Sequence, residues 1–197
     1  MFVVLILGSL TYVGFYFGKQ TKVPEQIEKS NEQIVTQQAV PTITPKPSTL
    51  ITVVAGLSKS AGLSFDQYSI VTPDDWTSRK ESQTSLDEKL ILEKDGYSIS
   101  IFQAATGGAL CLYPGDADFE GPSSKFEIFT TLNTKDNRTL RRSGDNNGTA
   151  FTVCQKSADG SYQQPTNYGH ISIKLPSAWD DDGLKTVDSI ITSLKKI

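Results

Sequence analysis

The sequence predicts an α+β fold: an antiparallel β-sheet flanked by helices, preceded by an N-terminal transmembrane helix and a flexible linker. Three observations lead to this expectation. The chain opens with an apolar run, continues with apolar stretches separated by turn residues, and closes with an amphipathic stretch. The middle shows hairpins without a βαβ rhythm, which is typical of an antiparallel sheet, and the apolar face of such a sheet needs a covering layer.

The first 18 residues are expected to form a transmembrane signal-anchor. Residues 2–18, FVVLILGSLTYVGFYFG, carry no charge. As a helix rising ~1.5 Å per residue, the run spans roughly 25 Å, close to the ~30 Å hydrocarbon core of a bilayer. No cleavage site of the A-x-A type follows it, which favours an uncleaved anchor. Lys19 and Lys22 come next, and the positive-inside rule taken literally would keep the remaining chain in the cytoplasm.

Residues 19–62 are interpreted as a polar linker rich in proline and threonine, and residues 63–197 as the globular α+β domain. Pro41, Pro45 and Pro47 favour an extended, solvated chain, because proline lacks an N–H and disfavours helix in the residue before it. Within the linker, LITVVAGL (50–57) is apolar and β-branched. It could form a short strand, lie on the domain as a hydrophobic arm, or be disordered.

The expected strands are separated by turn signals. Residues 68–72 alternate and stop at Pro73, and residues 88–103 form a hairpin whose tight turn is Asp95-Gly96. In its second strand Tyr97, Ile99 and Ile101 share one face. Further strands are expected in ALCLYPGD (109–116), Ala150–Lys156 and NYGHISIKLP (167–176).

Two helices are expected to flank the sheet. The final segment (177–197) has one apolar stripe, formed by Leu184, Val187, Ile190, Ile191 and Leu194. Asp180–Asp182 at its start and Lys195–Lys196 at its end complement the helix macrodipole. The second helix is favoured for SSKFEIFTTLNTK (123–135), where Phe126, Phe129 and Leu132 have helical spacing, with a strand as the alternative.

The only two cysteines, Cys111 and Cys154, both fall in expected strands. They could be two buried free thiols, but a disulfide is favoured because the N-terminal anchor, the linker rich in proline and threonine and the even number of cysteines agree with one another. A bridge would stabilise the fold by up to roughly 4 kcal/mol on the chain-entropy estimate. It also favours a single-pass cell-membrane protein with its C-terminal domain extracytoplasmic, against the lysine count.

The charge balance limits the expected partners. A net charge of -3 and a pI near 5.2 give no basic field for nucleic acid. The membrane, through the N-terminal helix, and another envelope protein are the expected partners. Arg138, Arg141 and Arg142 form a small basic cluster that could contact an anionic polymer or headgroup, although a solvated face is the ordinary interpretation.

No residue pattern assigns a reaction, a catalytic residue or a cofactor. His170 is the only histidine, which excludes a two-His zinc motif, and no nucleophile elbow accompanies it. Asp116, Asp118 and Glu120 alternate along one loop and could hold a divalent cation, but a solvated loop is favoured and no metal is assigned. The sequence therefore favours a non-enzymatic binding domain of unknown ligand. The alternative is an exported hydrolase or metal-dependent enzyme that uses Asp116–Glu120.

Two short patterns resemble PsbP-type extrinsic domains over residues 64–197. YSIVTPDDW (68–76) and VDSIITSLK (187–195) match the family at Tyr68, Pro73, Trp76, Ile190 and Ser193. The resemblance implies an antiparallel sheet sandwiched by helices and a non-enzymatic subunit that docks on a membrane complex. Cys111 and Cys154 are not part of that pattern, and the metal sites of the family cannot be placed on this sequence.

Overall fold

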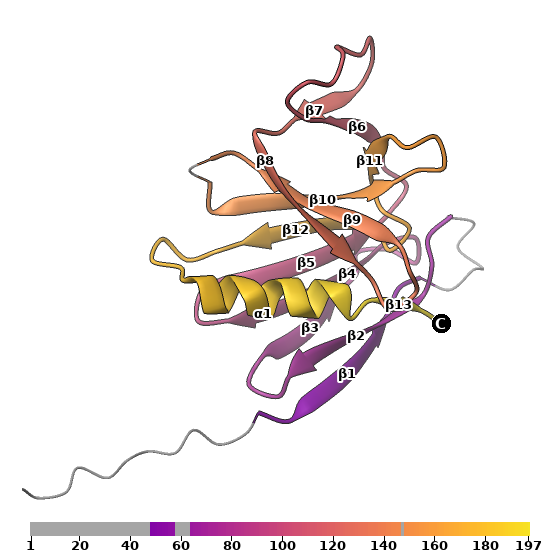
Figure 1. Cartoon of the computed structure of the whole chain (residues 1–197). Coiled ribbons are helices and arrows are strands. Elements are labelled where there is room, and N and C mark those ends of the chain that lie inside the picture. Colours follow the sequence, from indigo (N-terminus) through magenta and orange to yellow (C-terminus); the bar gives the residue numbers. More distant parts are fainter. Residues whose placement is uncertain (1–47, 58–63, 147) are drawn as a thin grey trace, which may run out of the picture. The chain divides into compact units, whose positions relative to one another are not determined.

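The computed structural model of the protein describes residues 48–57, 64–146 and 148–197, all within one compact unit, Pro45–Ile197. This part of the chain is mostly β-sheet, with a large mixed sheet, a small sheet and one short helix (Figure 1). The expected sheet flanked by helices is thus corrected to a sheet with a single helix in these ranges. They contain no helix long and apolar enough to span a membrane, and the expected anchor lies outside them.

The small sheet has the strand order β1-β2-β13 and is antiparallel. It consists of β1 (Leu50–Ala55), β2 (Tyr68–Pro73) and β13 (Lys195–Lys196). The strand alternative for residues 50–57 is therefore the one that the structure shows, although these residues fall in the range expected to be linker. The strand predicted to stop at Pro73 is confirmed.

The large sheet contains the other ten strands. Its order is β3-β4-β5-β12-β10-β11-β6-β7, while β9 pairs with β10 and β8 pairs with β9. Every ladder is antiparallel except β6–β7, which is parallel. The strands are β3 (Thr77–Glu81), β4 (Glu88–Lys94), β5 (Tyr97–Gln103), β6 (Ala109–Leu112), β7 (Ser123–Lys125), β8 (Ile128–Asn133), β9 (Thr139–Gly144), β10 (Ala150–Lys156), β11 (Tyr162–Gln164) and β12 (His170–Lys174).

The hairpin of β4 and β5 confirms the turn prediction. Asp95 and Gly96 both adopt positive φ, 49° and 85°, as the tight turn between twisted antiparallel strands requires. The next strand then buries Ile99 and Ile101 on one face, and Tyr97 on the same face is partly buried. This face forms the floor of the hydrophobic core.

Helix α1 (Asp181–Thr192) covers that core (Figure 1). Asp180 caps the helix, since its carboxylate accepts the N–H of Gly183 at 2.7 Å. Val187, Ile190 and Ile191 are buried against the sheets, and each contributes roughly 1.5–3 kcal/mol by burial. The helix contacts β2, β5 and β8. It ends before Lys195–Lys196, which form β13 instead of the expected last helical turn.

The helix favoured for residues 123–135 is wrong. This segment forms β7 and β8, and β8 pairs with β9 along its whole length. Its β-branched residues Ile128, Thr130 and Thr131 suit a strand. The aromatic side chains at helical spacing serve a different cluster, in which Phe126 and Phe129 both lie beside Tyr113.

The disulfide between Cys111 and Cys154 is confirmed and joins β6 to β10. It closes a sequence separation of 43 residues, and both cysteines are buried in a second hydrophobic cluster with Tyr113, Phe126 and Tyr162. This cluster is separate from the core under α1. The covalent bond therefore fixes the part of the large sheet that α1 does not cover.

We expect Ile191→Asp to unfold the domain. The substitution removes roughly 1.5–3 kcal/mol of apolar burial and places a carboxylate where no water reaches, and the sum approaches the 5–15 kcal/mol that stabilise a typical domain. Ile197→Asp is the matched control, because Ile197 is 57% exposed and should tolerate the charge. Circular dichroism melts of the two variants test this packing, and a wild-type melt for Ile191→Asp would contradict it.

Replacing both cysteines by serine should lower the free energy of unfolding by up to about 4 kcal/mol, because the open chain gains conformational entropy. Urea denaturation with and without dithiothreitol measures this effect: reductant should destabilise the wild type and leave the double variant unchanged. Alkylation of the native protein should label no thiol before reduction. Labelling of two thiols in unreduced protein would rule out the bridge.

Candidate functional site

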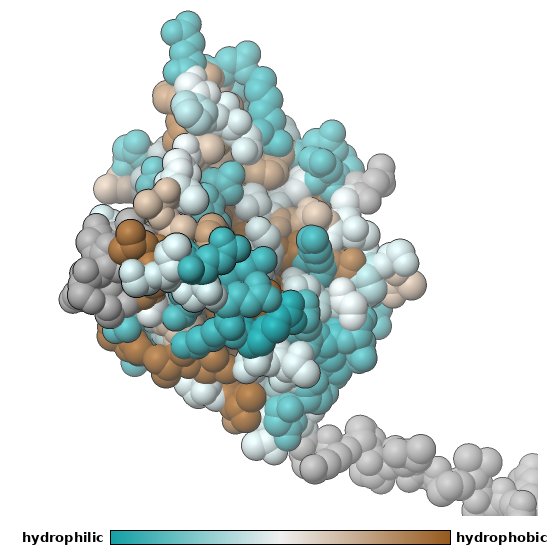
Figure 2. Space-filling model, turned by 180° about the vertical axis from the view of Figure 1, so that it is seen from behind, coloured by the Kyte–Doolittle hydropathy of each residue, from teal (hydrophilic) through white to brown (hydrophobic). Residues whose placement is uncertain are grey.

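A hollow with a volume of about 660 Å³ lies on the face of the large sheet opposite α1. Its floor and walls come from β4, β5 and β12 and from the loop 82–87 between β3 and β4. Residues on this face alternate with the core residues Ile99 and Ile101, so they point away from the helix. Figure 2 looks onto the domain from the side away from α1, where hydrophilic residues cover the middle.

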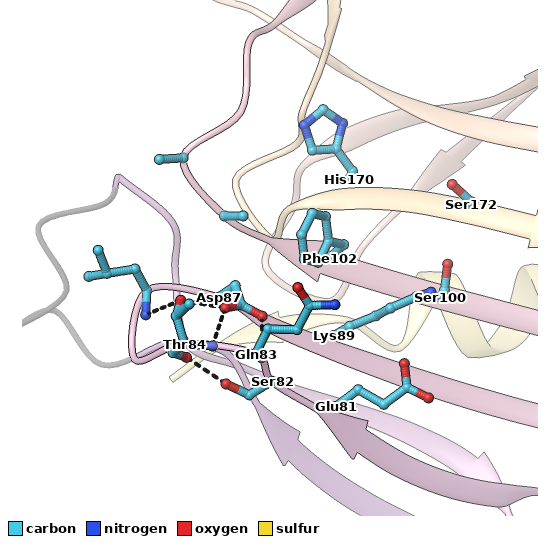
Figure 3. A pocket seen from close by; sticks show the side chains of 13 residues that line it. Glu81, Ser82, Gln83, Thr84, Asp87, Lys89, Ser100, Phe102, His170 and Ser172 are labelled. Carbon is cyan, nitrogen blue, oxygen red and sulfur yellow. Dashed lines mark hydrogen bonds between the residues drawn. The ribbon is translucent and has the colours of Figure 1, made fainter.

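Differences in side-chain size create the hollow. Two cross-strand rows cross the sheet here, and in one of them Ser100 lies directly opposite Ser172. In the neighbouring row Phe102 lies between Lys89 and His170. The serines are short and form a floor, whereas the longer side chains of the second row form a wall (Figure 3). Neither serine hydroxyl has a hydrogen-bond partner among the described residues, so both are available to a ligand.

The loop 82–87 forms the opposite rim and is held by one carboxylate. Asp87 accepts the backbone N–H of Gln83 at 2.9 Å and that of Thr84 at 2.6 Å, and it also accepts the Thr84 hydroxyl. These hydrogen bonds, the one from the Thr84 hydroxyl foremost, lower the pKa of Asp87. Asp87 is therefore ionised at neutral pH and occupied in shaping the loop.

His170 stands at the upper end of the hollow in Figure 3, with Phe102 between it and Asp87. Its Nε2 lies 2.7 Å from the Thr106 hydroxyl, and burial lowers the pKa of the imidazole below its usual value. The ring is therefore neutral at pH 7. Within the ranges that the structure describes, His170 has no carboxylate partner, and it offers the hollow a polar contact.

Two carboxylates of the acidic loop suggested for a cation already have partners in the protein. Asp116 accepts the backbone N–H of Tyr113 at 2.8 Å, and Asp118 forms an exposed ion pair with Lys125. Glu120 is exposed. The described residues contain no group of three His, Cys, Asp or Glu side chains that could hold a metal ion.

The basic cluster does not form a surface for an anionic partner. Arg142 donates to Asp188 on α1 at 2.7 Å, and Arg141 stacks against three aromatic rings, those of Tyr113, Phe129 and Tyr162, at 3.9 to 4.4 Å. The third member, Arg138, binds Asp66 and Asp136. The interpretation of these arginines as a solvated or headgroup-binding face is therefore wrong, because all three hold the domain together.

A network of ion pairs surrounds Arg138. Asp66 accepts from Arg138 at 2.7 Å and from Lys196 at 2.6 Å, which ties β13 to the loop before β2. Burial would raise the pKa of Asp66, but the hydrogen bonds and charges of Lys196 and Arg138 outweigh it, so the pKa is lowered. The same balance lowers the pKa of Asp136, which accepts from Thr134, Tyr168 and the Lys196 N–H. The network is structural, since it joins β13, the loop before β2 and the turn between β8 and β9.

Comparisons with known proteins give this chain no match to a family model, to a curated protein or to a solved structure.

Sequence reasoning missed the residues of the hollow, although one signal for them was present. In β5 and β12, Ser98, Ser100 and Ser172 alternate with isoleucines. The isoleucines predicted the buried face, and the same alternation places small hydroxyl residues together on the opposite face. No sequence pattern predicted that the loop 82–87 forms a rim of the hollow, because this loop and β12 are far apart in the sequence.

We expect Asp66→Asn to lower the free energy of unfolding by about 1.5–3 kcal/mol at pH 7, because two charge-assisted hydrogen bonds are lost. A carboxyl whose folded pKa is lowered stabilises the fold above its ordinary value of 3.8, and this contribution is lost as the pH falls through the folded pKa. The difference between variant and wild type should therefore shrink below pH 3.8.

Urea denaturation across this pH range measures the effect. Asp118→Asn serves as the control, because the Asp118–Lys125 pair is exposed and its loss should not change stability measurably. Equal effects of the two substitutions at pH 7 would contradict a structural role for the Asp66 network.

Proposed function

We propose that this protein is a membrane-anchored extracytoplasmic binding domain, and that the hollow over β4, β5 and β12 receives a neutral, hydroxyl-rich ligand such as an envelope glycan. The observation that carries the proposal is the pair Ser100 and Ser172, whose hydroxyls have no hydrogen-bond partner among the described residues and face one open hollow beside the ring of Phe102. Sugars present hydroxyls at their edges and apolar C–H groups on their faces. A floor of hydroxyls beside an aromatic wall complements both features.

The charges around the hollow favour a neutral ligand. Lys89 contributes one positive charge, while Glu81 and Asp87 contribute two negative ones. His170 adds no charge at neutral pH, since burial lowers its pKa. An anionic ligand would meet the two carboxylates, and the single lysine would not compensate for both. The hollow's volume of about 660 Å³ lies in the range of small-ligand sites and suits a short oligosaccharide.

The disulfide supports the extracytoplasmic location, because such bonds persist in oxidising compartments. The apolar run at residues 2–18 supports the membrane anchor. Together they support a domain held near the outer side of a cell membrane, where envelope glycans and other envelope proteins are the available partners.

One contact bears on the proposed resemblance to PsbP-type domains. The two quoted patterns, far apart in the sequence, meet in the structure: the Ser193 hydroxyl accepts the Val71 N–H at 2.7 Å. Ser193 follows the last turn of α1, and Val71 lies in the middle of β2. This contact supports the view that the two patterns form one structural frame.

Filling the hollow should weaken binding while the fold survives. Ser100→Leu places a larger side chain on the floor and should weaken the binding of a neutral oligosaccharide by at least about tenfold, since one lost polar contact with steric overlap costs more than 1.4 kcal/mol. Calorimetric titration of the full chain in detergent with maltohexaose, cellohexaose and chitohexaose measures this.

Ser98→Leu is the matched control, because Ser98 lies on the same strand and face but outside the hollow. It should bind like the wild type. The proposal fails if none of the three oligosaccharides binds the wild type, or if Ser98→Leu and Ser100→Leu weaken binding equally.

A further inference from the structure

The strand β1 has an open edge unlike the other edges of the two sheets. In the ranges that the structure describes, it pairs with β2 only. It is six residues long and uncharged, and its side chains Leu50, Ile51 and Val54 are 67%, 38% and 54% exposed. In Figure 2 a hydrophobic band follows the lower margin of the domain, where Figure 1 places β1.

The other edge strands carry the usual protection against pairing. The exposed strand β3 contains Arg79, Lys80 and Glu81, and the short strands β7 and β13 have three and two residues and include lysines. The uncharged strand β8 is contacted by α1. Charged, short or covered edges resist association with a further strand, whereas a long, uncharged, exposed edge favours it.

The backbone groups at this edge are defined by the pairing with β2. The Thr49 carbonyl accepts the Asp74 N–H, so residue 49 points its groups toward β2. The Val71 N–H and C=O both bond the Ser193 hydroxyl and so point away from Thr52, which lies opposite Val71. Because successive residues of a strand point to opposite edges, Leu50, Thr52 and Val54 present their N–H and C=O groups to the open side.

We propose that β1 pairs with β1 of a second copy of this chain, antiparallel and about a two-fold axis at Thr52. In a symmetric pair of β1 strands, residues whose backbone N–H and C=O groups point to the open edge must lie opposite each other. The register that uses all three such residues places Thr52 opposite Thr52 of the second copy, and Leu50 opposite Val54. Every facing pair is then uncharged, and the β-branched and apolar side chains lie in contact across the strands.

Two hydrogen bonds fix the position of β1 before a second copy binds. The Gly56 N–H donates to Glu88 at 2.6 Å and the Leu57 N–H donates to Gln103 at 2.7 Å, which fixes the end of β1 to β4 and β5. A single edge buries less than the ~1,200 Å² of a standard interface, so the dimer belongs to the weak, reversible class. Membrane anchoring, which belongs to the proposed function, would strengthen pairing by raising the local concentration of copies.

Oxidative cross-linking of the full chain in lipid vesicles tests the register. The native cysteines are already joined, so Thr52→Cys introduces the only free thiol. In a hydrogen-bonded antiparallel pair the facing Cα atoms are about 5.5 Å apart, within the range of a disulfide. We expect dimer formation, read on non-reducing gels, at a rate at least about tenfold above that of Thr77→Cys on the charged edge β3, because prior pairing raises the effective thiol concentration.

Two further variants define the register. Leu50→Cys alone should not form a dimer, because its counterpart lies four residues along the strand, about 14 Å away. A mixture of Leu50→Cys and Val54→Cys should form the mixed dimer. If Thr52→Cys stays monomeric, or reacts only as fast as Thr77→Cys, no second copy occupies the edge and the proposal is wrong. Equal cross-linking of Leu50→Cys alone and Thr52→Cys would also overturn it. None of these results depends on an oligosaccharide, so the glycan proposal can fail independently.

Discussion

The packing of α1 against the sheets is the contact on which the rest of the described fold depends. The helix buries Val187, Ile190 and Ile191 in the core and contacts β2, β5 and β8, and it is the one helix in the described ranges. Its end also determines the small sheet, since β13 follows three residues later and pairs with β2. Because one face of the large sheet is taken by the helix, the opposite face over β4, β5 and β12 is left open for the hollow.

Local signals in the sequence predicted most of the elements that they could specify. Asp95-Gly96 defined a hairpin because few residues other than glycine, asparagine and aspartate tolerate positive φ. The carboxylate of Asp180 defined the start of α1. The segment 123–135 could not be decided locally, because Phe126 and Phe129 suit a helix by spacing and a strand by the partner they find in the aromatic cluster. Pairing with β9, a nonlocal event, decided the outcome.

The candidate site was hidden for a related reason. Sequence reasoning looked for charged groups close together in the chain, and so considered the loop of Asp116 and Asp118 and the arginines near Arg141. In the structure Asp116 and Arg141 make contacts within the domain, while Asp118 forms only an exposed ion pair. The hollow instead depends on registers, Ser172 with Ser100 and Phe102 with Lys89, that join segments distant in sequence. The alternation of small polar residues with isoleucine predicted that one face of the sheet is polar. It did not predict that this face is hollowed.

The hollow and the open edge of β1 belong to different sheets and share no residue, so a ligand and a second copy can be bound together. This separation has an energetic consequence. Envelope glycans are repetitive polymers, and a single shallow site binds one segment of such a polymer weakly. Two copies joined through β1 would present two hollows to the same polymer, and the second binding step would become intramolecular, with avidity gains of about 10²–10⁴ over one site. Weak pairing of the chains and weak binding of the glycan would then stabilise each other. A polymer that spans both hollows binds the paired chains more tightly than a single chain, and it therefore favours the paired state.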